Sequence, residues 1–168
     1  MNLKILPALI TGIVALNSTN NAKPNADIKT GLNYPVDISV AIADLNNDSL
    51  KDLVLASPLG VQVFYNKGKT FSSSWIYKDN SKFYTLKVGV DIGDYNNDGL
   101  ADIVYATPEG VRLLENTNQG FKDSGLIYKN QDSQYITGVD VKLEDLNKDN
   151  KLDIVYANSG VIKFLIQD

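Results

Sequence analysis

One nine-residue pattern occurs three times in the sequence, and this repetition limits the folds that the chain can adopt. Each copy has aspartate at positions one, five and nine and asparagine at position three. The copies begin at Asp44, Asp94 and Asp145, which are 50 and then 51 residues apart. A period of this length is typical of arrays and propellers, in which neighbouring units cover one another's apolar faces. We therefore expect a repeat architecture.

The oxygen-bearing side chains of this pattern predict a calcium site in each loop. Ca²⁺ takes about six to eight oxygen ligands, and alternate residues of a curled loop can aim at one central point. The main-chain oxygen of position seven and water would complete each set. The alternative is that the loops are Asx-rich turns without metal. The predicted ligands are Asp44, Asn46, Asp48, Leu50 and Asp52; Asp94, Asn96, Asp98, Leu100 and Asp102; and Asp145, Asn147, Asp149, Lys151 and Asp153.

Position six of each loop requires a sharp turn. Gly99 can adopt a positive φ without a steric penalty. Ser49 and Asn150 stand at the same position in the other two loops, and asparagine tolerates the left-handed conformation better than serine. The first loop therefore has the least favourable residue at this turn.

The segments around the loops have the composition of β-strands. They are rich in β-branched residues, and turns with Gly, Pro or Asn separate them. No apolar period of 3.6 residues continues for three turns after residue 22, so the domain is expected to be all-β. The expected strands are residues 36–43, 53–56, 61–65 and 74–77; 85–93, 103–106, 111–115 and 125–128; and 136–144, 154–157 and 161–166.

The middle repeat resembles a known family. Residues 88–104, which contain the middle loop followed by Ile103-Val104, are similar to the calcium-bearing FG-GAP/VCBS-type repeat of integrin α-subunit β-propellers and many bacterial secreted proteins. The resemblance covers about residues 34–168. It implies a β-propeller-like array of three four-stranded blades, with the loop residues above as calcium ligands. The Phe-Gly and Gly-Ala-Pro strings of integrins are absent, and the repeats are fewer than in a full propeller.

The N-terminal residues differ in character from the repeats. Lys4 precedes an apolar run over residues 5–16, so we expect residues 1–22 to be a signal peptide or, alternatively, an N-terminal anchor. A signal peptide would imply export to the extracellular space or cell surface, with no transmembrane span in the mature chain. Residues 23–168 would form the three-repeat domain. Its repeats cover about 34–83, 84–134 and 135–168, and residues 23–33 are expected to close the last blade.

The composition excludes several functions. The net charge is −4 and no basic run occurs, which argues against nucleic-acid binding. Cysteine and histidine are both absent, so disulfides, thiolate chemistry and the commonest general base are excluded. We expect no enzymatic activity. The residues considered for the enzyme alternative are Asp91 and Asp140, which lie outside the loop pattern.

The expected function is recognition of a glycan or a protein surface by an exported calcium-binding module. The alternative is a structural component of a cell surface, appendage or virion that calcium makes rigid. The aromatic residues considered for ligand binding are Trp75, Tyr77, Phe83 and Tyr128, which alternatively pack between blades; those expected in the repeat core are Tyr34, Tyr84, Tyr135, Tyr105 and Tyr156. Three blades are few for a closed ring, so we also expect a head-to-tail homodimer.

Overall fold

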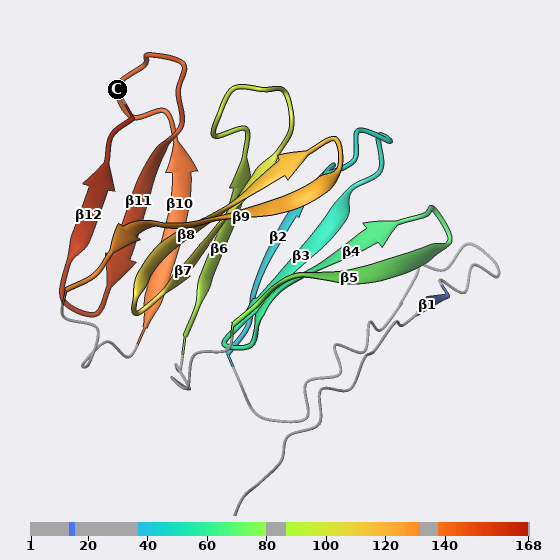
Figure 1. Cartoon of the computed structure of the whole chain (residues 1–168), viewed down its shortest axis with the longest axis horizontal. Coiled ribbons are helices and arrows are strands. Elements are labelled where there is room, and N and C mark those ends of the chain that lie inside the picture. Colours follow the sequence, from blue (N-terminus) through green and yellow to red (C-terminus); the bar gives the residue numbers. More distant parts are fainter. Residues whose placement is uncertain (1–13, 16–36, 80–86, 132–137, 168) are drawn as a thin grey trace, which may run out of the picture.

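The computed structural model describes residues 14–15, 37–79, 87–131 and 138–167. Within these residues the chain folds into three antiparallel sheets that lie side by side, without any helix (Figure 1). The prediction of an all-β chain is confirmed. None of the described segments is a helix capable of spanning a membrane.

Apart from the short strand β1 (Val14–Ala15), which joins the first sheet at its edge, the strands of each sheet form a meander in which consecutive strands are paired. The first sheet contains β2 (Ser39–Ala43), β3 (Asp52–Ser57), β4 (Gly60–Asn66) and β5 (Thr70–Lys78). The second contains β6 (Gly89–Gly93), β7 (Asp102–Thr107), β8 (Gly110–Thr117) and β9 (Gly120–Lys129). The third contains β10 (Val139–Glu144), β11 (Asp153–Asn158) and β12 (Ile162–Leu165). We call these sheets 1, 2 and 3.

Two features of the sheets differ from the expectation. The fourth strands begin earlier than expected, at Thr70 and Gly120 instead of residues 74 and 125. In sheet 1 the hydrogen bond from the Lys67 N–H to the Thr70 oxygen (2.8 Å) closes a tight turn, so β5 pairs with β4 directly after it. Sheet 3 has three strands among the described residues instead of four. Residues 23–33, which were expected to complete it, lie outside the described part. The short strand β1 (Val14–Ala15) instead pairs with Thr70 and Phe71 of β5.

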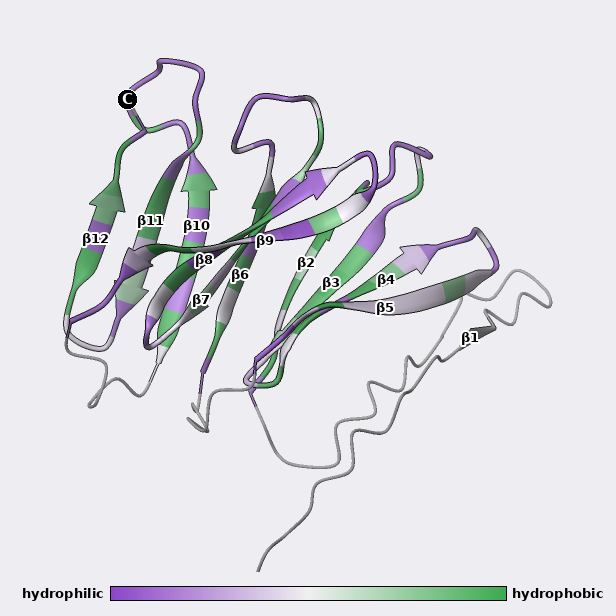
Figure 2. Ribbon diagram, in the orientation of Figure 1, coloured by the Kyte–Doolittle hydropathy of each residue, from purple (hydrophilic) through white to green (hydrophobic). Residues whose placement is uncertain are grey.

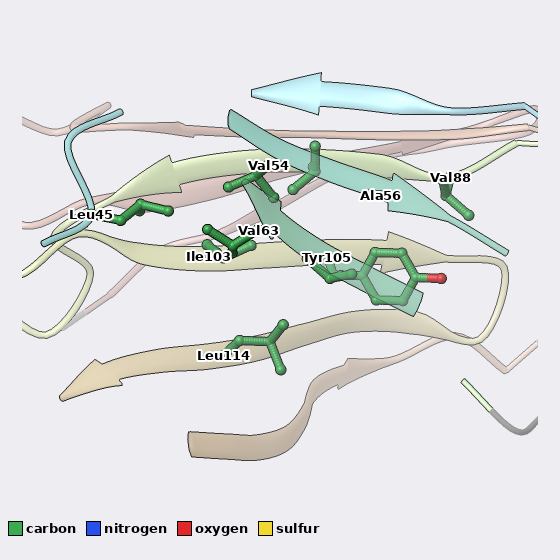
Figure 3. Close-up of a cluster of buried hydrophobic side chains, with 10 residues drawn as sticks. Leu45, Val54, Ala56, Val63, Val88, Ile103, Tyr105 and Leu114 are labelled. Atoms are coloured by element: carbon green, nitrogen blue, oxygen red, sulfur yellow. The ribbon is translucent and has the colours of Figure 1, made fainter. Parts of the chain in front are cut away.

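The hydrophobic core lies at the two boundaries between the sheets. Sheet 2 is covered on both sides, so β7 is buried along its whole length. Its Ile103 and Tyr105 pack against sheet 1, whereas Val104 and Ala106 pack against sheet 3. Figure 3 shows Ile103 beside Val63 of sheet 1. The continuous apolar run of β7 is therefore explained by burial on both faces.

The first strands of the sheets lie closest to one another, with β6 in contact with both β2 and β10. A Cβ atom on Gly89 would come within 2.8 Å of the Asp140 Cα, so glycine permits this approach. Two tyrosines add polar contacts between sheets: the Tyr105 hydroxyl donates to the Ser57 oxygen at 2.8 Å, and the Tyr156 hydroxyl to the Thr107 oxygen at 3.4 Å. Both are buried, which confirms their expected place in the core.

Candidate functional site

The three aspartate-rich loops occupy equivalent places in the fold. Each connects the first and second strands of its sheet: β2 to β3, β6 to β7, and β10 to β11. Figure 1 shows the three connections at the same edge of the array. The repeated sequence therefore places the same side chains along one edge.

Within the middle loop, side-chain oxygens gather around main-chain amides. Asp94 accepts hydrogen bonds from the N–H groups of Asp98 (3.0 Å) and Gly99 (2.8 Å). The Asn96 side-chain oxygen accepts from the same Asp98 N–H at 3.0 Å. The Asp98 carboxylate in turn accepts from the Leu100 N–H at 2.9 Å. Positions one and three thus direct their oxygens to one point of the loop.

The outer loops repeat this pattern closely. Asp44 accepts from the N–H groups of Asp48 (3.2 Å) and Ser49 (2.8 Å). Asp145 accepts from those of Asp149 (3.2 Å) and Asn150 (2.9 Å). The three loops therefore share one geometry despite different residues at position six.

The shared geometry includes positive φ angles at two positions. Position six has φ of 67° at Ser49, 86° at Gly99 and 67° at Asn150. Position four is also left-handed, with φ of 57° at Asn47, 58° at Asn97 and 66° at Lys148. A residue with a Cβ costs roughly 1–2 kcal/mol in this region. The hydrogen bonds that main-chain N–H groups donate to the side chains at positions one, three and five help to hold the loops in this conformation.

The aspartate at position nine is placed differently from the others. Asp52, Asp102 and Asp153 are fully buried. One oxygen of Asp102 accepts from the Tyr95 N–H at 3.1 Å, and the other accepts from the Asn116 N–H at 2.8 Å. Burial raises the pKa of Asp102, and its hydrogen bonds to main-chain N–H groups oppose this rise. The residue therefore ties the start of its loop to the end of β8.

The donor chemistry of the loops suits a hard cation, because each loop offers carboxylate and amide oxygens and no sulfur or imidazole. Among the described residues, however, no group of three or more acidic side chains is placed to hold a metal ion. The carboxylates instead accept hydrogen bonds from main-chain amides, as Asx-rich turns do. The side chains at positions one, three and five are those that would face a bound ion.

An amide contact between neighbouring sheets was not anticipated from the sequence. The Asn116 side chain, at the end of β8, donates to the main-chain oxygen of Leu45 at 2.8 Å. Gln167, which follows β12, donates in the same way to the Tyr95 oxygen at 3.2 Å. The recurrence of an amide residue at this point, where the first repeat has Asn66, is the signal that could have revealed it.

Two of the four aromatic residues considered for ligand binding, Tyr77 and Tyr128, pack inside the array. The Tyr77 and Tyr105 rings are 5.9 Å apart, and those of Tyr128 and Tyr156 are 5.4 Å apart, each pair crossing a sheet boundary. Trp75 is half-buried on β5. The remaining aromatic positions of the expectation, Phe83, Tyr34, Tyr84 and Tyr135, lie outside the described residues.

The two acids considered for catalysis are both hydrogen-bonded to main-chain N–H groups. Asp91 accepts from the Leu143 N–H at 2.9 Å and lies 3.7 Å from the Lys142 amine. Asp140 accepts from the N–H of Val141 at 2.9 Å. Asp140 also borders a pocket of about 350 Å³, which Lys87 and Ser159 help to line.

The three sheets are arranged like successive blades, and each carries the same loop geometry at the same edge. The chain is therefore a β-repeat protein. The FG-GAP-like repeat matches residues 44–105 and 94–156. The chain belongs to this repeat family, as its resemblance indicated. No curated protein sequence matches the chain.

A solved structure is similar to this chain at low sequence identity. It is a lectin of Agrocybe aegerita whose structure was described as the basis of its specific recognition of non-reducing terminal N-acetylglucosamine. The two chains are 21% identical with a TM-score of 0.59. The similarity covers 87% of this chain but 43% of the other, so this chain spans less than half of that fold. At this identity the likeness concerns the fold.

Proposed function

We propose that this chain is an exported, calcium-binding module of β-propeller type that recognises a glycan or protein surface and has no enzymatic activity. The observation that carries the proposal is the set of three loops with equivalent hydrogen bonds at one edge of the array. Loops held on a rigid scaffold are common sites of recognition. Calcium would hold these loops in one conformation and keep that edge rigid.

A glycan is the favoured ligand class for two reasons. The similar solved structure is described as recognising terminal N-acetylglucosamine. In this chain, the half-buried Trp75 offers an aromatic ring, and the pocket beside Asp140 and Lys87 offers polar groups for sugar hydroxyls. Catalysis has less support, because both Asp91 and Asp140 already accept main-chain hydrogen bonds.

Binding of the calcium-loaded chain to a glycan array tests this function. The array should include glycans with non-reducing terminal N-acetylglucosamine, and binding should disappear when a chelator is added. Trp75→Ala and Asp140→Ala each remove one candidate contact, and Ser72→Ala on the exposed side of β5 is the control. Light scattering on each variant would show that its assembly state is unchanged.

Two results would contradict the proposal. Binding to no glycan or protein surface, together with polymerisation when calcium is added, would favour the structural alternative. Turnover of a polysaccharide that is lost in Asp91→Ala or Asp140→Ala would favour an enzyme.

A further inference from the structure

Both outward faces of the described array carry exposed apolar side chains. On sheet 1, Ile38, Val40 and Ile42 are 51%, 54% and 62% exposed. On sheet 3, Ile162 and Phe164 of β12 are 60% and 62% exposed. Figure 2 shows β12 coloured largely as hydrophobic. Contiguous apolar patches of this kind mark interaction surfaces.

The two boundaries inside the chain are built from the same two kinds of face. We call the first the leading face, which consists of Val54, Ala56, Val61 and Val63 on sheet 1 and of Val104, Ala106, Val111 and Leu113 on sheet 2. We call the second the trailing face, which consists of Val90, Ile103, Tyr105 and Leu114 on sheet 2 and of Val141, Ile154, Tyr156 and Leu165 on sheet 3. At each boundary a leading face packs against the trailing face of the next sheet.

The exposed residues of sheet 3 belong to a leading face without a partner among the described residues. Phe164 pairs with Val155 across β11 and β12, as Leu113 pairs with Val104 across β7 and β8. Ile162 likewise takes the place of Val111. Sheet 3 therefore presents the kind of surface that sheets 1 and 2 bury.

The exposed residues of sheet 1 lie at the β2 side of a trailing face, whose β3 and β4 residues Leu55 and Phe64 are only 6% and 5% exposed. Val40 pairs with Leu55, as Val90 pairs with Tyr105 in the next sheet. Ile42 pairs with Leu53, on the same face. The described array thus ends in one leading and one trailing face, which are the two complementary surfaces of its internal boundaries.

The amide contact between sheets extends the same correspondence. In the first repeat, Asn66 occupies the position of Asn116 and Gln167, the two side chains that donate across the internal boundaries. In the third repeat, the main-chain oxygen of Leu146 occupies the position of their acceptors, the oxygens of Leu45 and Tyr95. Within its own chain Asn66 donates to the Lys51 oxygen at 3.1 Å. The tyrosine contact is not reproduced, because Leu55 occupies the place of Tyr105.

We propose that a second copy of this chain covers the exposed apolar residues of both faces. The leading face of sheet 3 in each copy packs on the trailing face of sheet 1 in the other, which closes a head-to-tail ring of two chains and six sheets. The second copy is the favoured occupant because the chain already makes this contact twice internally. Two copies of this chain would agree in length with the similar solved structure, because 87% of this chain matches only 43% of that one. This proposal depends on neither calcium nor a glycan ligand.

Light scattering on the full chain at tens of micromolar tests the proposal. The wild-type mass should be twice the 18.4 kDa of one chain. Phe164→Glu and Val40→Glu should each reduce it to the mass of one chain, because a charged side chain enters an apolar boundary. Both positions are exposed within one chain, so each variant should keep its β-sheet circular dichroism.

The matched control is Leu59→Glu, in the turn between β3 and β4. Leu59 is 41% exposed and is not part of the strands that carry the two faces, and Glu109 occupies the same position in the second repeat. This variant should remain a two-chain species.

A mixture of the two disrupting variants tests the head-to-tail pairing. The Phe164→Glu chain keeps a normal trailing face and the Val40→Glu chain a normal leading face, so the mixture should regain a two-chain species that neither forms alone. A wild-type chain with the mass of one copy would overturn the proposal. So would a dimer that survives Phe164→Glu, or a mixture that stays at one-chain mass, since both would exclude pairing of unlike faces.

Discussion

The side-chain amide of Asn116 joins sheet 2 to the first aspartate-rich loop through a 2.8 Å hydrogen bond to the oxygen of Leu45, 71 residues earlier in the chain. The contact between Gln167 and the Tyr95 oxygen repeats this link at the next boundary. The first and second loops are thus each attached both to their own sheet and to the following one. A change at the loop edge should therefore affect the boundary between sheets.

Replacing Asn116 with alanine should lower the free energy of unfolding by about 1–3 kcal/mol, because the buried Leu45 oxygen would lose its donor. Urea denaturation measures this change. The control is Gln119→Ala at an exposed turn, which should stay within about 0.5 kcal/mol of wild type. An equal effect of the two substitutions would show that the contact between sheets contributes little.

Replacing Asp102 with asparagine should destabilise the chain even when a chelator is present. Both oxygens of the carboxylate accept hydrogen bonds from main-chain N–H groups. In asparagine an NH2 group replaces one of these oxygens, and it cannot accept a hydrogen bond from the N–H that it would face. We expect a loss of about 1–3 kcal/mol in denaturation with excess chelator. If the loss appeared only in the presence of calcium, Asp102 would act chiefly through a metal.

The sequence was sufficient to predict the sheets and the loops. The 50-residue period identified the repeat, and the alternation of β-branched runs with Gly and Pro turns located strands such as β7 and β8. The left-handed turn at Gly99 followed from the absence of a Cβ. These features depend on neighbouring residues, which a sequence shows directly.

Contacts between distant residues were harder to predict. The position-nine aspartates were assigned to calcium, yet the burial of Asp102 and its bond to Asn116 depend on how β8 returns to the loop. Tyr77 was considered for sugar stacking, but its ring lies beside Tyr105 of the next sheet. Which face of a strand packs against another sheet depends on the order in which the sheets pack. The spacing of residues in the sequence does not specify this order.

Calcium should raise the melting temperature of the chain. An ion that binds the folded state alone contributes about 2.7 kcal/mol per site at a hundredfold excess over its Kd. Differential scanning calorimetry with millimolar calcium and with excess chelator measures this shift. Identical melting temperatures in the two conditions would contradict the assignment of the loops to calcium.

The stoichiometry of binding tests individual loop residues. Native mass spectrometry should find one calcium ion fewer per chain in Asp98→Ala than in wild type, because a predicted ligand is lost. Asn97→Gly is the matched control, since position four has φ of 58° and glycine tolerates this angle. Loss of an ion in the control but not in Asp98→Ala would mean that the ligand register is wrong.

Replacing Tyr105 with phenylalanine should make the chain less sensitive to alkaline pH. Burial raises the pKa of Tyr105 above its ordinary value of 10.0, so the hydroxyl stays protonated in the folded chain where the unfolded chain ionises it. The unfolded state then binds fewer protons, and the stability from Tyr105 is lost as the pH rises above about 10. At pH 8 the wild type should be more stable by about 1 kcal/mol, through the hydrogen bond to the Ser57 oxygen. Denaturation at pH 8 and about pH 11 should show this difference shrinking or reversing, whereas a constant difference would mean that Tyr105 ionises equally in both states.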